Sequence, residues 1–370
     1  MERLATNRRR LRLCPFMRPL FSASCPRLAA LALFLLGTTL ACAAPAAASS
    51  APASAAASKK ATTAPVREAG ASPIEIKVPI WNPAGQPVTS WLEAQVALAR
   101  RGISCGAIDG VAGAQSVAAL QAWQESRDLP ATGALDDATR AQLLLLTPPL
   151  TEVTLTADDL ARLQPLSTTW LGKSQQTALD YETALELVAE RAHAHPALIK
   201  RLNPTVDWSQ PLPVGAKLTV PAVGRVTLDG AVAHLHIYLA GHTLEARDAD
   251  GGLIAHFPVS IAHMAEKRPE GELHVTVVIP GPNYTFDPAV FPESAEAREL
   301  GRKLVLPPGP NNPVGVAWIG LDRPGYGIHG TPVPEQVGRT ESHGCFRLAN
   351  WDAQTLLGLA WVGLPVIVDP

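Results

Sequence analysis

Alternation of apolar and polar side chains in the C-terminal part of the chain constrains its fold more than any other feature. Leu235, Ile237 and Leu239 share one face of a predicted strand, and residues 273–279 repeat the same period of two. This period is typical of strands that bury one face. Further apolar runs bounded by Gly and Pro occupy residues 253–259, 314–321 and 366–368. The pattern predicts that residues 225–370 form a β-rich sandwich or barrel with few helices.

A small helical module is predicted upstream, over residues 88–147. Apolar residues recur there at helical spacing: Leu92, Val96, Ala99, Val117, Leu120 and Trp123. A turn with two glycines separates the first two helices, and a third begins near Asp136, where an acidic side chain suits a helix N-terminus. We interpret Cys105, just before the turn, as a core residue and not as a reactive thiol.

A second short module is predicted over residues 178–222. Residues 183–190 indicate one helix, and Pro196 opens another at its first turn, where proline is tolerated. Residues 218–221 then indicate a strand. The chain as a whole is therefore expected to be a multidomain α+β protein.

The N-terminus has the composition of an export signal. The first 43 residues hold seven Arg and one acidic residue, and they include an apolar run of 13 residues at 28–40. This run is shorter than the roughly 20 residues that span a bilayer, and the small residues at 41–43 suit a cleavage site. We predict a signal peptide over residues 1–43. An uncleaved anchor, lipid attachment at Cys42 and a start at Met17 are alternatives.

A flexible linker is predicted over residues 44–80, because this Ala-, Ser- and Pro-rich stretch has too few bulky apolar side chains to bury a core. Without the first 43 residues the chain has 24 basic and 32 acidic residues, a net charge of −8. This balance argues against nucleic acid as a partner.

Candidate chemistry lies in two short motifs, His-Gly-Thr at 329–331 and Ser-His-Gly-Cys-Phe-Arg-Leu at 342–348. A thiol becomes a useful nucleophile as the thiolate, and a neighbouring imidazole can accept its proton. Gly344 lets a substrate carbonyl approach the backbone, and N–H groups near Cys345 can stabilise an oxyanion. The planar guanidinium of Arg347 matches a carboxylate.

Two other interpretations of these residues stay open at this level. His329, His343 and Cys345 are three potential zinc ligands, although no fourth ligand at regular spacing is evident. A buried and inert thiol is the other alternative. Three further histidines are interpreted as surface or hydrogen-bonded side chains: His234, His236 and His274.

The two motifs resemble the catalytic signature of the L,D-transpeptidases, the YkuD-fold family. Further similar segments occur at residues 269–271, 283–288, 312–315 and 350–352. The resemblance covers nearly all of residues 226–370 and implies a β-rich YkuD catalytic sandwich. Phe346 departs from the family pattern, because a branched aliphatic residue is usual there, and Glu272-Leu273 stand in place of the common Thr-Phe.

The resemblance implies a role for each matching residue. Cys345 is expected to be the nucleophile, and His329 the general base and later the acid, oriented by the Gly330 carbonyl. His343 and Gly344 are expected to shape the oxyanion pocket. Four residues are expected to contact the substrate: Arg347, Gly330, Ser342 and Tyr326.

The resemblance also implies peptidoglycan as the substrate. The residue-3 carbonyl of a tetrapeptide stem would be attacked, D-Ala would leave, and an amine of a second stem would complete a 3–3 cross-link. A wall-attached lipoprotein is an alternative acceptor, and water as acceptor would give L,D-carboxypeptidase or murein hydrolase activity. A non-catalytic cell-wall-binding protein is a further alternative. No metal or cofactor is implied, and carbapenems are expected to acylate Cys345. The oligomeric state is left open.

The two upstream modules carry resemblances of their own. The helical module resembles the type 1 peptidoglycan-binding domain through residues 108–110, 122–124 and 129–133. The second module resembles a divergent LysM, a glycan-binding fold, through residues 202–204 and 220–221, with a spacer as the alternative. Both resemblances imply a wall-associated protein of the periplasm or cell envelope, held on an insoluble polymer by its binding modules.

Overall fold

The computed structural model describes residues 84–370 except 227, 229, 292–293 and 341–343. The predicted signal peptide and linker, and the predicted site residues Ser342 and His343, lie outside the described residues. All described residues belong to one contiguous unit, residues 66–370.

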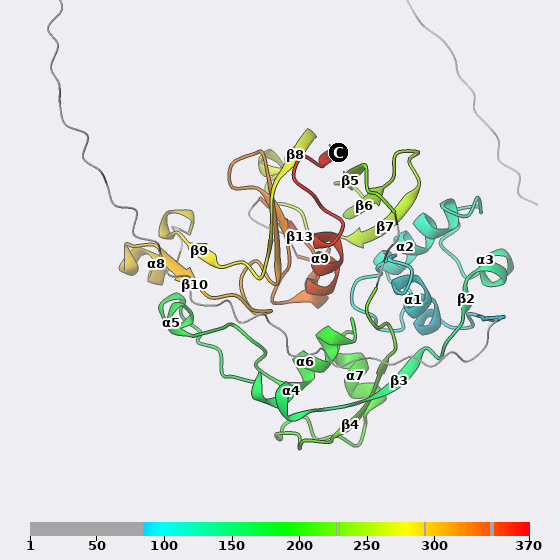
Figure 1. Ribbon diagram of the computed structural model, residues 1–370, viewed down its shortest axis with the longest axis horizontal. Helices are drawn as coiled ribbons and strands as arrows, with labels where there is room; N and C mark the ends of the chain where they lie inside the picture. Colours follow the sequence, from blue (N-terminus) through cyan, green and yellow to red (C-terminus); the bar gives the residue numbers. More distant parts are fainter. Residues whose placement is uncertain (1–83, 227, 229, 292–293, 341–343) are drawn as a thin grey trace, which may run out of the picture. The chain divides into compact units, whose positions relative to one another are not determined.

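The helical module contains the three predicted helices (Figure 1). They are α1 (Trp91–Ala99), α2 (Ala114–Glu125) and α3 (Asp137–Gln142), and a short antiparallel pair, β1 (Gln86–Pro87) with β2 (Leu144–Leu145), closes the module. Ser90 and Glu93 form a capping box on α1, and the Asp136 side chain caps α3. Cys105 is 3% exposed, as expected of a core residue.

The middle module has the predicted order of helix, helix and strand. Its elements are β3 (Leu150–Thr154), α4 (Ala157–Ala161), α5 (Trp170–Gln175), α6 (Ala184–Arg191), α7 (Pro196–Leu202) and β4 (Lys217–Pro221). β4 pairs antiparallel with β3, from Leu150–Pro221 to Thr154–Lys217. β3 lies upstream of residue 178, where the module was predicted to begin. Four helices, α4 to α7, separate it from β4 in the sequence. The likeness to LysM stays a prediction.

The C-terminal region is built around one eight-stranded sheet in the order β13-β12-β11-β8-β14-β5-β6-β7. The bounds are β5 (His234–Tyr238), β6 (Thr243–Arg247), β7 (Leu253–Pro258), β8 (Gly271–Pro280), β11 (Ala317–Leu321), β12 (Gly327–His329), β13 (Phe346–Arg347) and β14 (Pro365–Asp369). The first part of β8 pairs with β14 and the second part with β11. Apolar side chains from the strands on either side of β8, such as Leu235, Val366 and Ile319, share one core. The β-rich architecture is as predicted.

A smaller arm stands beside this sheet (Figure 1). It consists of β9 (Tyr284–Phe286), β10 (Leu304–Leu306) and α8 (Ala295–Leu300), and β9 pairs antiparallel with β10. Helix α5 of the middle module packs against it, with Leu171 and Trp170 on the cluster that includes Phe286. The remaining elements are α9 (Asn350–Leu357) and the single 3-10 turns η1 (Ala265–Lys267), η2 (Pro288–Val290) and η3 (Pro334–Gln336).

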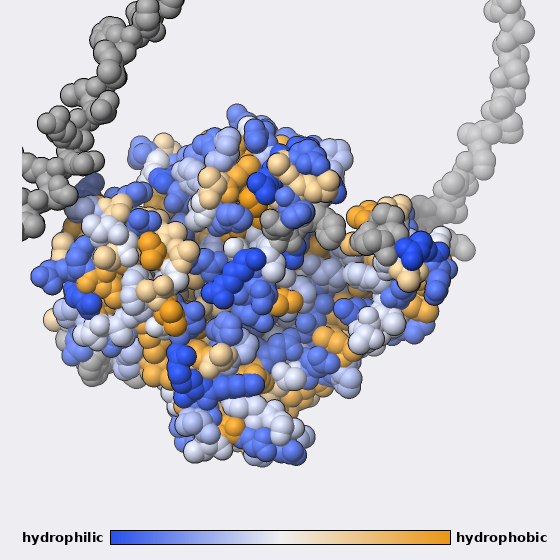
Figure 2. Space-filling view, turned by 180° about the vertical axis from the view of Figure 1, so that it is seen from behind, coloured by the Kyte–Doolittle hydropathy of each residue, from blue (hydrophilic) through white to orange (hydrophobic). Residues whose placement is uncertain are grey.

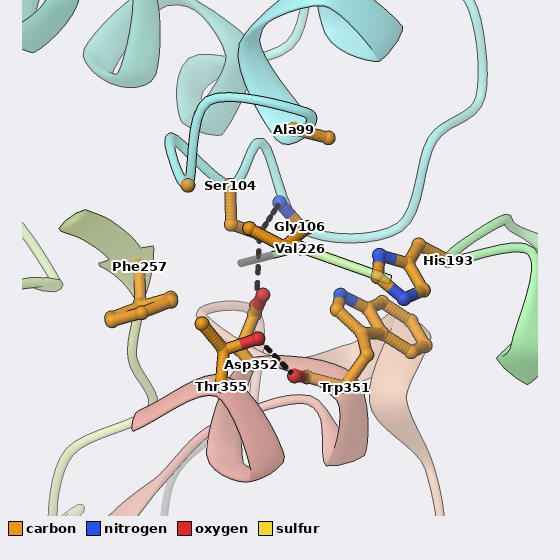
Figure 3. A pocket seen from close by; sticks show the side chains of 10 residues that line it. Ala99, Ser104, Gly106, His193, Val226, Phe257, Trp351, Asp352 and Thr355 are labelled. Carbon is orange, nitrogen blue, oxygen red and sulfur yellow. Dashed lines mark hydrogen bonds between the residues drawn. The ribbon is translucent and has the colours of Figure 1, made fainter. Parts of the chain in front are cut away.

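The helical module is joined to the sheet by backbone pairing. Ile103 forms a parallel bridge with His256 of β7, the last strand in the sheet order. The Ser104 amide donates to the His256 carbonyl at 2.8 Å, and the His256 amide donates to the Gly102 carbonyl at 3.0 Å. Edge strands expose unpaired backbone groups, and this contact covers part of that edge. Figure 3 shows the adjoining cavity, where Ser104 faces Asp352 of α9.

Polar and apolar side chains are interspersed on the face seen in Figure 2, so its apolar surface is broken into small patches. Among the described residues, none of the helices has the length and apolar character needed to cross a membrane.

Candidate active site

Strands β12 and β13 bring the two sequence motifs together. They pair in parallel, with Ile328 opposite Phe346 and His329 opposite Arg347. Cys345 directly precedes β13. Because directly paired residues share a face of the sheet, His329 and Arg347 project from the same side. The positive charge of Arg347 acts on both His329 and Cys345. A separation of 16 residues in sequence thus becomes adjacency on neighbouring strands.

His329 is held in one orientation. Its Nδ1 lies 2.6 Å from the Gly330 carbonyl, which accepts a hydrogen bond from the ring and leaves Nε2 as the proton acceptor. This is the orienting carbonyl that the family resemblance implied. The ring is 6% exposed and stacks on Trp318 at 5.6 Å between centroids. Burial lowers the pKa of His329 to about 4, and the positive charge of Arg347 acts in the same direction. The imidazole is therefore neutral at pH 7.

Cys345 is a partly buried cysteine that forms no disulfide with another described residue. Its Sγ lies 3.5 Å from the Gly325 carbonyl, to which the thiol donates. Burial raises the pKa of Cys345, while a backbone hydrogen bond from Gly327 and the positive charge of Arg347 lower it. The thiol is therefore protonated at rest, beside groups that stabilise negative charge on sulfur once the proton leaves.

Tyr326 and Gly344 lie beside Cys345 in the candidate site. A Cβ at Gly344 would lie 3.5 Å from the Tyr326 ring, so the aromatic ring covers the backbone directly before Cys345. The Tyr326 hydroxyl donates to the Lys267 carbonyl at 2.9 Å, and Arg323 lies over its ring at 4.5 Å. These contacts hold the ring at the site, where a bound substrate would meet it.

Two models of known protein families match this chain. A family model described as "L,D-transpeptidase catalytic domain", YkuD, matches residues 233–368, which include both motifs. The catalytic domain is a YkuD L,D-transpeptidase domain. A second model, described as "Putative peptidoglycan binding domain", matches residues 89–143. The helical module is thus a peptidoglycan-binding type 1 domain, as its resemblance implied.

Similar proteins include two relatives in sequence and one solved structure. The "Putative L,D-transpeptidase YkuD" of Bacillus licheniformis is 24% identical over 189 residues, which cover 51% of this chain and 94% of the relative. The "Putative L,D-transpeptidase YqjB" of Bacillus subtilis is 32% identical over 117 residues, or 30% of this chain and 57% of the relative. A solved L,D-transpeptidase from Mycobacterium smegmatis aligns with a TM-score of 0.30 and 21% identity, over 43% of this chain and 65% of that chain.

Asn350 organises the backbone behind the L,D-transpeptidase motifs, a role that the sequence did not reveal. Its Oδ1 accepts hydrogen bonds from the Thr331 amide at 3.0 Å and the Val316 amide at 3.3 Å. A Cβ at Gly330 or Gly315 would overlap this oxygen, so glycine is required at both positions. The glycine of the His-Gly-Thr motif therefore makes room for Asn350 and supplies the carbonyl that orients His329. The predicted contact of Gly330 with the substrate stays a prediction.

Tyr284 and Trp318 are further residues of the L,D-transpeptidase site that sequence reasoning missed. The pKa of Tyr284 is raised by burial and also by the charge of Cys345, which places the phenol within electrostatic range of the nucleophile. Tyr284 begins β9 and Trp318 lies on β11. Residues 283–288 resemble the family and residues 314–321 form a predicted strand, but neither pattern assigns a role to Tyr284 or Trp318, because the packing of the arm and of β11 directs them to the site.

The other histidines are placed as interpreted. His236 Nε2 lies 2.7 Å from Asp369, and His274 lies beside Asp322 at 3.2 Å. Within the part of the chain that the structure describes, no three His, Cys, Asp or Glu side chains converge as metal ligands.

Proposed function

We propose that the protein is an L,D-transpeptidase of peptidoglycan in which Cys345 is the nucleophile. Sγ attacks the carbonyl of residue 3 in a tetrapeptide stem and passes its proton to Nε2 of His329. The tetrahedral intermediate collapses, the peptide bond breaks, and the amine of D-Ala leaves with the proton that His329 returns. A thioester joins residue 3 to Cys345.

The second half of the reaction reverses these roles. An amine of another stem attacks the thioester carbonyl, His329 accepts its proton, and the Cys345 thiol is released as the new amide forms. A direct bond between third residues, a 3–3 cross-link, results. Water in place of the amine gives an L,D-carboxypeptidase, and an amine of a wall-attached lipoprotein gives protein anchoring.

The parallel pairing of β12 with β13 is the observation that supports this mechanism most. His329, a neutral imidazole whose Nε2 is left to accept a proton, lies opposite Arg347, two residues beyond Cys345. A neutral base beside a protonated thiol suits proton transfer during attack, with no resting ion pair required.

The surroundings of Cys345 supply the remaining functions. The Gly327 backbone and Arg347 favour the sulfur anion, and N–H groups at Gly344 and Cys345 are candidates for an oxyanion hole. The guanidinium of Arg347 suits a carboxylate of the stem. Tyr326 would border the bound stem. Ser342 and His343 complete the proposed set.

The peptidoglycan-binding module places the proposed chemistry at the cell wall. We infer an exported, wall-associated enzyme whose binding module raises the local concentration of stem peptides. A periplasmic location, a cleaved signal peptide and glycan binding by the middle module belong to the same proposal.

Purified disaccharide-tetrapeptides test the reaction. We expect the protein to produce a dimer whose mass equals two tetrapeptides minus one D-Ala, and Cys345→Ala to abolish this product, with at least about a 10³-fold loss of rate. Mass spectrometry reads the product, and a carbapenem such as meropenem should add its mass to Cys345.

Cys105→Ala is the matched control, because Cys105 is the other described cysteine and lies buried in the binding module. It should keep both turnover and the carbapenem adduct. Retained turnover in Cys345→Ala would refute the nucleophile assignment. Free tripeptide alone would identify the carboxypeptidase, and sacculus binding with neither product nor adduct would identify a non-catalytic wall-binding protein.

A further inference from the structure

The segment that leads to the nucleophile is fastened to the peptidoglycan-binding module. Val337 lies eight residues before Cys345, is 3% exposed, and packs with Ala349 and Trp351 of the catalytic domain. Ala107 of the binding module lies against the same cluster. Val337, in the described part of the segment between β12 and β13, therefore contacts two modules at once.

Gln115, in the first turn of α2, makes the polar contact across this junction. Its Nε2 donates to the Val337 carbonyl at 2.6 Å, over a sequence separation of 222 residues. This carbonyl belongs to a buried residue, and an unpaired buried carbonyl is costly. The bond thus selects one position for the backbone at Val337.

Two glycines enclose the Gln115 side chain. Gly338 has φ of +72° and Gly106 has φ of +73°, the left-handed region that favours glycine. A Cβ at Gly338 would overlap the Gln115 amide, and a Cβ at Gly106 would lie 2.6 Å from Oε1. The amide is therefore confined between the binding module and the catalytic loop.

Ser260 connects this contact to the other end of the loop. Its Oγ accepts from the Gly338 amide at 2.8 Å. Its backbone exchanges two hydrogen bonds with Arg347, at 2.9 and 3.0 Å, two residues beyond Cys345. Ser260 is 1% exposed, so it provides a rigid link. Gln115 and Ser260 hold the backbone at Val337 and Gly338, and Ser260 and strand β12 hold the backbone after Cys345.

We propose that Gln115 of the peptidoglycan-binding module is a positioning residue for Cys345, which makes the wall-binding module a working part of the active site. The inference rests on the proposed function, in which Cys345 attacks. Loss of the Gln115 donor removes one of the two hydrogen bonds that hold residues 337–338 and leaves the pairing after Cys345 in place. Small displacements of a reacting group slow the chemical step more than they weaken binding of substrate.

Gln115→Met tests this proposal, because methionine has similar length and no donor. We expect the rate constant of Cys345 acylation at saturating meropenem, and kcat with soluble disaccharide-tetrapeptides, to fall by about five- to ten-fold. KM should stay within about two-fold. Hydrogen exchange of the peptide that covers residues 333–347 should accelerate. Gln115→Glu, which lacks the donor when ionised, is the second variant if the first unfolds.

Gln121→Met is the control on the same helix, because Gln121 donates to Ala131 within its own module. It should change neither kcat nor exchange at 333–347. Unchanged acylation and exchange in Gln115→Met would overturn the proposal, as would equal effects in Gln121→Met. Exchange does not depend on turnover. A wild-type protein that forms no adduct therefore counts against the proposed function, while the exchange data still decide the role of Gln115.

Discussion

At the scale of single residues, the reactive pair is neutral before substrate arrives. Burial raises the pKa of the Cys345 thiol and lowers that of the His329 imidazole to about 4, so neither group is charged at pH 7. Arg347 shifts both pKa values downward, and it therefore stabilises the sulfur anion while keeping His329 unprotonated. One guanidinium thus serves both partners of the proton transfer.

These pKa directions predict the pH dependence of the reaction. A general base must be unprotonated, and His329 stays so until the pH falls to about 4. The second-order rate constant of acylation by meropenem should therefore be level between about pH 5.5 and 8 and fall as the pH drops through 4. In Arg347→Gln the acid limb should move to higher pH, because the charge that disfavours protonation is gone.

Stopped-flow acylation in mixed buffers measures this profile, with Arg127→Gln in the binding module as the control. An acid limb near 6.5, the ordinary pKa of histidine, would show that His329 is not held in the buried, neutral form.

At the scale of elements, a helix from the middle module supports the arm that carries Tyr284. Trp170 of α5 stacks on Phe286 with 4.4 Å between centroids, and Phe291 lies 5.7 Å away. The Leu171 amide donates to Glu296 of α8 at 3.0 Å. Phe286 is fully buried. A two-stranded hairpin has little stability of its own, so the order of β9 and β10 depends on this contact.

Trp170→Ala should therefore loosen the arm. Aromatic stacking contributes about 0.5–1.5 kcal/mol beyond area burial, and we expect amide exchange in β9 and β10 to accelerate about ten-fold, with unchanged exchange in β5 and β6. Hydrogen–deuterium exchange mass spectrometry measures both. Trp361→Ala is the control, because Trp361 is 48% exposed and lies outside the arm cluster. Equal exchange in Trp170→Ala and the parent protein would show that the arm is ordered without α5.

At the scale of the whole molecule, buried polar contacts tie both upstream modules to α9. Ser104 of the binding module donates to Asp352 at 2.8 Å, and Asn350 donates to Glu190 of the middle module at 3.0 Å. His193 stacks on Trp351 at 5.3 Å (Figure 3). Removal of residues 88–147 would uncover Asp352 and the β7 edge. The module is therefore more than a tether, and its deletion should destabilise the catalytic domain.

The buried contact between Ser104 and Asp352 should make the free energy of unfolding depend on pH. Burial raises the pKa of Asp352 to about 8, although the hydrogen bond from Ser104 lowers it. The folded protein therefore retains a proton that the unfolded chain loses near pH 4. The contribution of Asp352 to the free energy of unfolding is fully present below pH 4 and is lost as the pH rises to about 8. Asp352→Asn should remove this loss and stabilise the protein at pH 9 relative to the parent by about 1–3 kcal/mol.

Urea unfolding at pH 5, 7 and 9 measures the effect, with the exposed Asp250→Asn as the control. A constant difference between Asp352→Asn and the parent across these pH values would show that Asp352 does not hold its proton at neutral pH.

Much of the secondary structure was predictable because the signals are local. The apolar helical stripes predicted α1 and α2, Asp136 marked the start of α3, and alternation predicted β5 and β8. The short strands β12 and β13 were missed, since three and two residues are too few to show a period. β3 was missed as the partner of β4 because pairing between distant segments leaves no local pattern.

Some residues of the candidate site could likewise be found from the sequence, and others only from the structure. Cys345 and His329 stand out in the sequence because their motifs are distinctive, whereas Asn350, Gln115 and Tyr284 are ordinary residues whose importance comes from position. The catalytic-domain family was therefore predictable from the motifs, and the side chains that surround them were not.

The amino-acid sequence by itself determined which faces are buried, where helices begin, and which side chains carry reactive groups. Only the tertiary structure decided that β12 lies beside β13, that Gln115 meets Val337, and that Ser104 meets Asp352 across 248 residues. The physical reason is that hydrophobic periodicity is a property of a dozen neighbouring residues. The choice of partner depends on the free energy of packing the whole chain at once.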